Sequence, residues 1–572
     1  MKDLTVGSPT KAILGFALPL FIGHLFQLFY GLADTRIVGS CLGDDALAAV
    51  VATTTLNDLI VGFLVGLTNG FAVITARCFG AGDMERVRKA FGATLRLGFA
   101  VSVVLTMVSL IFLEQILVLL NMPAERMADG IAYIGVILGG MTFSMFYNAY
   151  ASTLRAVGDT AAPLVFLIVS AFLNIGLDLF CIEILNMGIA GASFATVVSQ
   201  ALSFFACIIY VNIRYPQLRL KKEDFGIDLK LDKQLMGTGI SMGLMSSLVC
   251  LGTVVLQGAI NKFGQTIIIA HGAARKITNI FMLPFGIFGM TMATYCGQCY
   301  GAGKYDRIKK GLLSATGICI AWSLLTIIAS YTIAEDLARL ITDTQLDEAV
   351  KTAALYLQID TLFYFLTAII SPFRNALQGI GDHITPLVSS AVELVGKVLA
   401  AYLLAPWLGY MGIILTEPIV RALIYYSNSS NRGMFKNKLT PINGIALSKP
   451  EYQILEYLCE FENENKIMTD IAHDLGIIPS IVTKSTKNLV ANGFAERYHI
   501  SGNRKNIVLK PTQAGREMYI RCCTKDVEKL FIPFFKALEG FTDEQLKTVE
   551  NAIYALGADW GELSDQLLEK LD

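Results

Sequence analysis

Long apolar stretches alternate with short polar loops over the first three quarters of the chain. Such stretches recur about twelve times before residue 430, and a helix needs roughly 20 apolar residues to cross a bilayer. They lie near 12–33, 47–73, 90–113, 131–153, 163–182, 189–212, 236–260, 268–295, 311–333, 354–372, 385–404 and 411–427. This pattern predicts an all-α membrane protein with twelve transmembrane helices embedded in the lipid bilayer.

Composition supports a membrane protein over a set of soluble domains. Hydrophobic residues make up 54% and charged residues 16% of the 572 positions, whereas a soluble domain carries roughly 25% charged residues. The net charge of -1 gives no overall field that would attract nucleic acid. Cys296 and Cys299 have no second cysteine pair or histidine beside them, so we expect packing residues and no metal site or cofactor.

Basic residues gather in every second loop of the predicted array. The loops after the even-numbered spans carry Arg77, Arg86, Arg88, Lys89, Arg155, Arg219, Lys221, Lys222, Lys304, Arg307, Lys309, Lys310, Arg374, Arg432, Lys436 and Lys438. The other loops are poor in basic residues or acidic, as at Asp44-Asp45 and Glu335-Asp336. The positive-inside rule therefore predicts that both termini, and everything after residue 430, are cytoplasmic in a multi-pass protein of the cell membrane.

The two halves of the predicted array repeat each other. Cys78-Phe79-Gly80-Ala81-Gly82 in the first half returns in the second as Cys299-Tyr300-Gly301-Ala302-Gly303. A second motif, Leu154-Arg155-Ala156-Val157-Gly158-Asp159, returns as Leu377-Gln378-Gly379-Ile380-Gly381-Asp382. Its two copies are separated by nearly the same number of residues as those of the first motif. Because each half holds six spans, an even number, the repeats run in the same direction. Parallel repeats around a central site are typical of secondary transporters.

These motifs resemble the multidrug and toxic compound extrusion (MATE) family over about residues 10–430. The resemblance rests on Pro19, Asp34 and Val38-Gly39 around the first span, on the two Cys-[Phe/Tyr]-Gly-Ala-Gly motifs, and on the two Gly-Asp-x-x-x-Pro-Leu loops. It implies an antiporter with an amino-terminal bundle over 1–215 and a carboxyl-terminal bundle over 216–430. The family expels small cationic amphiphiles in exchange for protons or sodium ions. No covalent step is needed, so we do not expect an enzyme.

Three polar residues in the first half are candidates for ion coupling. Asn174 and Asp178 lie one helical turn apart in the fifth span and share a face, and Asp34 lies near the outer end of the first. In the MATE family an Asp in the first helix and an Asn-x-x-x-Asp pair in the fifth form a cation site. A carboxylate in a low-dielectric cavity also holds a proton more readily than one in water. The alternative is that both acids reach headgroups, or that Arg36 neutralises Asp34.

Other polar residues within the spans have either a transport role or a structural role. Asp360 is a second proton-site candidate, with a polar contact inside the bundle as the alternative. His24 and Gln27 are expected to line the substrate cavity, with interhelical hydrogen bonding as the alternative. Glu393 with Lys397, and Glu417 with Arg421, are spaced four apart and are expected to form structural ion pairs.

The composition changes after residue 430. A polar linker over 431–445 precedes a soluble α+β domain over 446–572, in which 468–477 and the segment after Ser480 have helix-turn-helix spacing. This domain resembles the MarR-type winged-helix family. The resemblance implies that Thr483, Lys484 and Lys487 face duplex DNA, that Arg504 and Lys505 at the wing tip touch its minor groove, and that two copies dimerise. A protein-contact role is the alternative.

Two rival functions follow from the same features. A lipid-linked oligosaccharide flippase would need several basic residues in its cavity, and few Arg or Lys lie mid-span here. A membrane-tethered transcription regulator would use the spans only to sense a compound, so it would show no efflux.

Overall fold

The computed structural model describes residues 3–120, 122–342, 346–435, 447, 449–462, 467–468, 470–471, 479–500 and 503–520. Contacts divide the chain into a helical unit, Met1–Ser429, and a C-terminal unit, Ser430–Asp572. Residues 436–445 of the predicted linker over 431–445, the predicted helix-turn-helix turn over 472–478 and the predicted domain after 520 lie outside the described residues, whereas residues 431–435 of that linker are helical.

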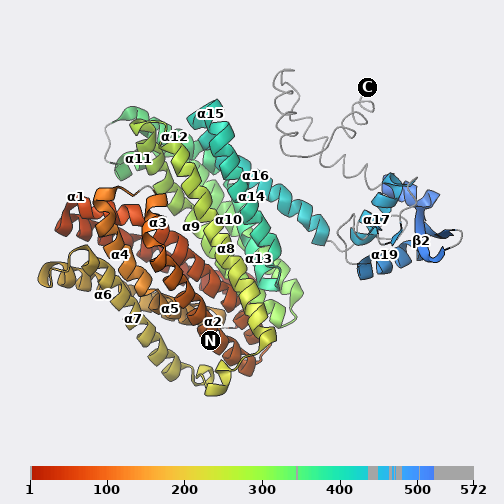
Figure 1. Ribbon diagram of the computed structural model, residues 1–572, viewed down its shortest axis with the longest axis horizontal. Helices are drawn as coiled ribbons and strands as arrows, with labels where there is room; N and C mark the ends of the chain where they lie inside the picture. Colours follow the sequence, from red (N-terminus) through yellow and green to blue (C-terminus); the bar gives the residue numbers. More distant parts are fainter. Residues whose placement is uncertain are drawn as a thin grey trace. The chain divides into compact units, whose positions relative to one another are not determined.

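The helical unit is a sequence of helices, many of them long and apolar (Figure 1). They are α1 (Pro9–Gly80), α2 (Met84–Ile111), α3 (Leu113–Leu119), α4 (Met127–Gly139), α5 (Met141–Ala156), α6 (Ala161–Leu179), α7 (Ile189–Arg214), α8 (Leu229–Ile260), α9 (Gln265–Gly301), α10 (Tyr305–Thr332), α11 (Ala334–Thr342), α12 (Asp347–Leu362), α13 (Tyr364–Ile380), α14 (Ile384–Leu399), α15 (Ala405–Leu408) and α16 (Tyr410–Phe435). Within the described residues, nine helices are long and apolar enough to span a membrane, with α1 divided into two. Two bent pairs, α4 with α5 and α12 with α13, raise that number to 11. Helix α16, which contains the predicted twelfth stretch over 411–427, is not among these spans.

The backbone repeats itself as the sequence does. Gly43, where α1 breaks with φ 82°, corresponds to Gly264 before α9, with φ 87°. Such a φ is accessible to glycine at little cost because glycine has no Cβ. A π-helical segment follows α6 at η2 (Phe180–Ile184), and another follows α14 at η5 (Ala400–Leu404). The halves therefore share irregular features as well as helices.

Helices α1 to α7 form one bundle and α8 to α16 the other, drawn in warm and in yellow-to-cyan colours in Figure 1. In the first bundle α5 packs against α1, α2 and α7. In the second, α9 packs against α10, α12 and α13, while α8 packs against α14. The bundles meet where α1 packs against both α8 and α9. A cavity beside α1 therefore lies next to the second bundle.

The repeated glycine motif forms a close crossing between α1 and α9, which we call the crossing and define by Arg77, Gly80, Gln298 and Gly301. A Cβ at Gly80 would lie 2.0 Å from the Gln298 carbonyl oxygen, and a Cβ at Gly301 would lie 2.0 Å from the Arg77 carbonyl oxygen. Gln298 directly precedes the second copy of the motif, as Arg77 directly precedes the first. The two contacts are therefore equivalent by the repeat, and glycine is required at both.

Hydrogen bonds reinforce the crossing in the same symmetric way. Arg77 Nε donates to the Gly379 carbonyl at 2.9 Å, and Gln298 Nε2 donates to the Ala156 carbonyl at 2.8 Å. Gly379 is the repeat counterpart of Ala156, since each is the third residue of its copy of the second motif. The crossing thus joins the two bundles at the end where α2 and α10 begin.

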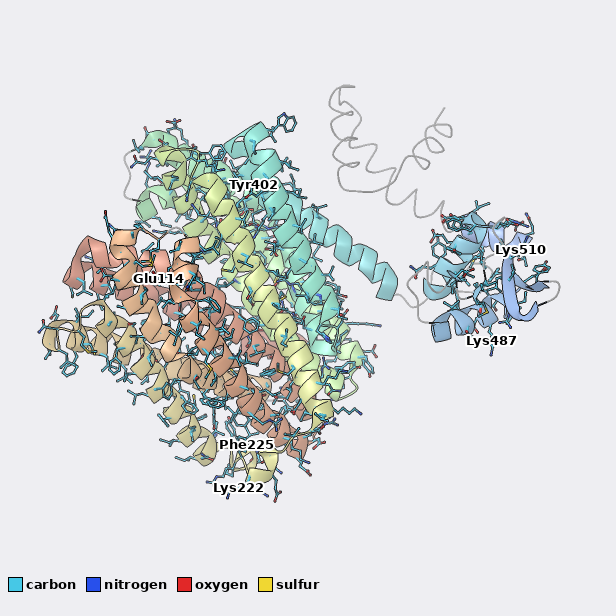
Figure 2. The ribbon with its side chains drawn as sticks, viewed as in Figure 1. Glu114, Lys222, Phe225, Tyr402, Lys487 and Lys510 are labelled. Atoms are coloured by element: carbon cyan, nitrogen blue, oxygen red, sulfur yellow. The ribbon has the colours of Figure 1, made fainter. Side chains whose placement is uncertain are left out.

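Many residues assigned to basic loops lie inside helices. They are Arg77 in α1, Arg86, Arg88 and Lys89 in α2, Arg155 in α5, Arg307, Lys309 and Lys310 in α10, Arg374 in α13 and Arg432 in α16. The expectation that these ten residues lie in loops is wrong, because the helices continue beyond their apolar stretches. Lys222, by contrast, lies in a short loop helix at one end of the bundle (Figure 2).

The described part of the C-terminal unit includes helices and a hairpin. These are α17 (Lys449–Glu460), α19 (Pro479–Ala491), a helical segment over 513–520, β1 (Ala495–Ile500) and β2 (Asn503–Pro511), with β1 and β2 antiparallel. Leu455, Leu458, Val482, Leu489 and Leu509 are part of its buried core. The prediction placed Arg504 and Lys505 at the hairpin tip, but their backbone belongs to β2.

Candidate functional site

Asp34 on α1 and Asp178 on α6 meet inside the first bundle. The two carboxyl groups lie close enough to interact electrostatically, and two ionised carboxylates so placed repel each other. Asp178 is fully buried. Arg36 is exposed and forms no ion pair with Asp34 within the described residues, so the two acids share a site that no cation in this part of the chain neutralises. We call them the carboxyl pair.

Polar groups from three further positions surround the carboxyl pair. Asn174 is buried beside Thr196 of α7, at 3.3 Å between their side-chain atoms. With its amide nitrogen turned toward Tyr30, Asn174 donates to the Tyr30 hydroxyl at 2.8 Å and to Asp178 Oδ2 at 3.1 Å. That orientation satisfies both ends of the amide. Asp34 Oδ1 and Asp178 Oδ1 are buried without a hydrogen-bond partner among the described residues, so the site retains capacity for a positively charged ligand.

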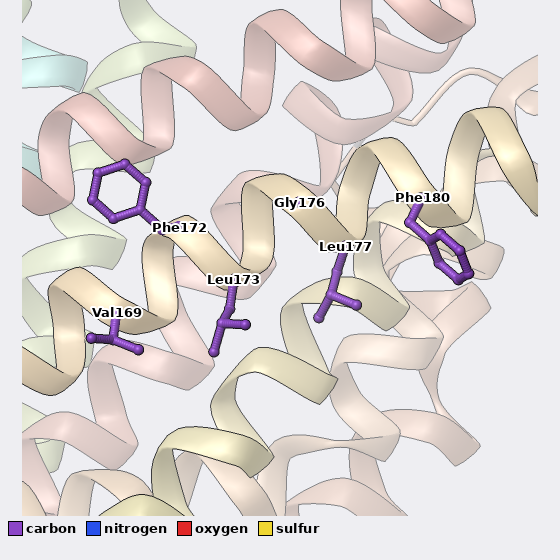
Figure 3. A pocket seen from close by; sticks show the side chains of 6 residues that line it. All are labelled: Val169, Phe172, Leu173, Gly176, Leu177 and Phe180. Atoms are coloured by element: carbon purple, nitrogen blue, oxygen red, sulfur yellow. The ribbon is translucent and has the colours of Figure 1, made fainter.

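Helix α6 presents its polar residues inward and its apolar residues outward. Asn174 and Asp178 are buried, whereas Val169, Phe172 and Leu173 are exposed. Figure 3 shows these apolar side chains along α6, around a shallow hollow that continues past Gly176 to Phe180. All of its lining residues are apolar or glycine, so this face suits lipid chains and not a polar ligand.

A central cavity of about 400 Å³ lies beside the carboxyl pair, between α1, α5 and α6, with Met290 of α9 on one wall. His24 and Gln27 line it, as the sequence predicts. Gln27 also lines a second cavity of about 250 Å³ that contains Asp34. Because Gln27 and Val61 border both cavities, the central cavity and the cavity of Asp34 adjoin.

Asp360 lies in the second bundle and is neutralised there. Its Oδ1 is 2.6 Å from Arg421 Nη1, and Tyr364 donates to its Oδ2 at 3.1 Å. Glu417 joins the same cluster, 3.6 Å from Arg421 and 3.2 Å from Lys397. All five side chains are buried or nearly so. Asp360 therefore differs from the carboxyl pair in having a basic partner.

Two further arginines extend this buried charge network. Lys397 Nζ lies 3.0 Å from Glu393, which Arg374 approaches at 3.8 Å, and Arg275 lies 3.8 Å from Glu417. The expected pairs Glu393–Lys397 and Glu417–Arg421 are thus present. Within the described residues the network holds three acids and four bases. The expectation that few basic residues lie mid-span is therefore wrong, although the bases of the network have acidic partners.

The candidate DNA-contacting residues are partly described. Thr483 and Lys487 are exposed on α19, opposite the buried Val482, Thr486 and Leu489, and Figure 2 labels Lys487 there. The side chains of Lys484, Arg504 and Lys505 lie outside the described residues.

Sequence reasoning missed several residues that the fold brings to the site. Tyr30, Tyr133 and Thr196 line the cavity of the carboxyl pair, and Asp58 and Arg155 line the central cavity. They come from five places on four helices, so no spacing along the chain links them. Asp58 in the middle of an apolar stretch was the one signal that could have been used.

Comparison with known proteins agrees with this architecture. The sequence profile of the MatE family matches residues 19–180 and again 242–403, two segments of equal length that reproduce the internal repeat. "Probable multidrug resistance protein YoeA" of Bacillus subtilis is 28% identical over 417 residues, which are 69% of this chain and 89% of the relative. "Multidrug export protein MepA" of Staphylococcus aureus is 23% identical over 430 residues, which are 72% and 91% of the two chains.

A solved structure shares the fold. It is described as the outward-facing conformation of a multidrug resistance MATE family transporter, and it superposes with a TM-score of 0.70 at 23% identity, over 75% of this chain and 98% of that one. The profile match ends at residue 403, so the MarR-type assignment of the C-terminal unit stays a prediction. The profile matches more than half of the chain, and the chain is therefore a multi-pass membrane protein that belongs to the MATE family of transporters, which are not enzymes.

Proposed function

We propose that this protein exports small amphiphilic organic compounds that carry a positive group, in exchange for an ion that binds the carboxyl pair. The observation that carries the proposal is the unneutralised pair Asp34 and Asp178 beside the central cavity, each with a buried oxygen that has no hydrogen-bond partner among the described residues. The relatives YoeA and MepA are named for multidrug resistance and multidrug export, and both roles agree with such a cargo.

Competition for one negative charge couples the two movements. The carboxyl pair is stable with one added positive charge, because two ionised carboxylates in contact repel each other. A proton or a cationic cargo can supply that charge. Arrival of one therefore favours release of the other, and a change of access between the two events makes the exchange directional.

The coupling ion is proposed to be a proton. Two neighbouring carboxyl groups can share one proton, because their mutual repulsion disfavours ionisation of both. Within the described residues, three or more His, Cys, Asp or Glu side chains are nowhere grouped as a metal site. Asn174, Tyr30 and Thr196 hold the pair in place and offer it neutral dipoles.

The test is transport by full-length protein in liposomes, driven separately by a pH gradient and by a sodium gradient, with a fluorescent organic cation as cargo. We expect the pH gradient to drive transport and the sodium gradient to fail. Asp34→Asn and Asp178→Asn should each abolish coupled transport, while Glu114→Gln, which changes an exposed acid on α3, should leave it intact. Normal transport by both pair variants would overturn the proposal, and sodium-driven transport would overturn the choice of ion.

The proposed orientation places both termini and the basic loops in the cytoplasm. The basic charge at the starts of α2 and α10, at Arg86, Lys89, Lys309 and Lys310, supports it. The rival oligosaccharide flippase would need several cavity bases for a pyrophosphate, and Arg155 is the one lysine or arginine among the described residues that line the central cavity. This observation favours export of smaller amphiphiles.

For the C-terminal unit we propose a regulatory role with weak contact to duplex DNA as a dimer. Exposed Lys487 on α19, next to a hairpin whose second strand carries Arg504 and Lys505, supports this reading. In the isolated 436–572 fragment, binding to duplex DNA should weaken steeply with salt, and Lys484→Ala with Arg504→Ala should flatten that dependence. If the fragment binds no duplex at low salt even when dimerised artificially, the unit contacts protein or ligand instead.

Deleting the C-terminal unit separates transport from sensing. A transporter with a regulatory appendage should keep exporting after the deletion. A tethered regulator that only senses a compound should export nothing with or without the unit.

A further inference from the structure

Arg155 lies inside the first bundle and has no acidic partner among the described residues. Its Nη2 donates to Asn69 Oδ1 at 3.2 Å, and an amide oxygen is neutral. In the described part of the chain no Asp or Glu lies within 4.0 Å of it, in contrast to Arg374 and Arg421 of the charge network. The side chain lines the central cavity. Its charge is therefore available to whatever occupies that cavity.

The fold does not need a charge at this position. The repeat counterpart of Arg155 is Gln378, the second residue in the other copy of the same motif, which is fully buried in the second bundle. Gln378 has the same place near the end of α13 as Arg155 has in α5, and it is neutral. The equivalent position therefore folds and packs without a cation, which leaves the charge of Arg155 to be explained by a ligand.

An unpaired arginine inside a membrane protein is costly and stays charged. Guanidinium does not lose its proton in proteins, and an ionised side chain inside the membrane marks a binding or transport pathway by default. Its planar fork of N–H donors fits a carboxylate with two parallel hydrogen bonds. The neighbouring Asn148, His24 and Tyr147 on the cavity wall offer further polar or aromatic contacts to the same group.

The cavity also has an acidic end. Asp58 lines it without an ion pair among the described residues. Asp58 and Asn69 lie on the same helix, α1, and are separated by about 16 Å along its axis at about 1.5 Å per residue. Since Asn69 holds Arg155, the acidic and basic groups lie well apart along the cavity, which is polarised from one end to the other.

We propose that Arg155 binds an anionic group of the cargo, and that the preferred cargo is a zwitterionic amphiphile. Its cationic centre lies at the acidic end of the cavity, toward Asp58 and the adjoining carboxyl pair, and its carboxylate lies against Arg155. This inference rests on the proposed export function and names its substrate class more narrowly. A purely cationic compound pairs only with the acidic end of the cavity, because it leaves Arg155 without an anionic partner.

The test compares two dyes that differ in one group: a rhodamine with a free carboxylate and the methyl ester of the same dye. Binding of each to full-length protein in lipid nanodiscs is measured by fluorescence anisotropy. We expect wild type to bind the acid about tenfold or more tighter than the ester, because a charge-assisted hydrogen bond is worth that much or more. Arg155→Gln should remove this preference by weakening the acid, with the ester changed by less than about twofold.

Arg155→Lys serves as the matched variant, since it keeps the charge but loses the fork; it should retain part of the preference. Asp58→Asn should weaken acid and ester together, because both dyes carry the same cationic ring. Equal binding of the two dyes by wild type would overturn the proposal, and that measurement depends on no variant. Equal weakening of both dyes in Arg155→Gln would also overturn it, because this result would assign Arg155 to the packing of α5.

Failure of the proposed export function gives a different result. If wild type in liposomes moves neither dye under any ion gradient, export is refuted, while the acid-over-ester preference in binding still decides the role of Arg155. If the ester is exported and the acid is bound no better than the ester, export stands and the zwitterion preference falls.

Discussion

Removing Arg421 should destabilise the second bundle more than any other single change in its charge network. Arg421→Gln leaves Asp360, which is fully buried, with the Tyr364 hydroxyl but without a cation. Glu417 keeps two basic partners in the same variant, Lys397 at 3.2 Å and Arg275 at 3.8 Å. The expected damage is therefore concentrated on Asp360.

The size of the loss follows from this geometry. Breaking a buried ion pair by removing one partner costs about 3–5 kcal/mol, because the other charge stays buried and uncompensated. Asp360→Asn should cost less, since Arg421 still has Glu417 at 3.6 Å. Combining the two changes removes both charges. The double variant should therefore lose about 1–3 kcal/mol less free energy of unfolding than the two single variants lose together.

Thermal unfolding of the full chain in detergent measures this cycle. The buried thiols of Cys296, Cys299 and Cys319 become accessible when the second bundle opens, so a thiol-reactive dye reports unfolding. Arg421→Gln should show the lowest midpoint, and Asp360→Asn added to it should raise that midpoint. A midpoint equal to wild type for Arg421→Gln would refute the reasoning. Loss of export in a fully stable Asp360→Asn protein would show instead that Asp360 takes part in ion coupling.

Three other changes test the fold of the helical unit. Gly80→Val should block closure of the crossing and stop transport at normal expression, because the valine Cβ would overlap the Gln298 carbonyl. A Cβ at Gly176 meets no other atom, so Gly176→Ala should transport normally. Cysteines replacing Asp336 and Lys309 should react with impermeant reagents from opposite sides of the membrane. Labelling of both cysteines from the same side would refute the proposed topology. Arg307→Ala removes hydrogen bonds to the carbonyls of residues 4, 6 and 7, so limited proteolysis should cut this segment faster than in wild type.

The sequence predicted the parts of the fold that depend on local pattern. Spans follow from apolar length, and Asn174 with Asp178 follow from spacing on one helix face. Local sequence pattern predicted less of the central cavity. Arg155 was assigned to a loop because the apolar stretch ends before it, yet a helix that borders a polar cavity can continue with polar residues. The partners of Glu417 come from α9 and α14 as well as α16, and no spacing rule relates helices so far apart in the chain.

The crossing has the properties of a symmetric dimer interface folded into one chain. In an interface with two-fold symmetry every contact occurs twice, and here Arg77 with Gly379 is matched by Gln298 with Ala156. One rigid movement of the bundles must break both members of each pair together, since neither helix can withdraw from one contact and keep the other. Opening at this end should therefore be cooperative, with a closed and an open state and no stable halfway position. One glycine motif, used twice, thus lies on both sides of a single interface between the bundles.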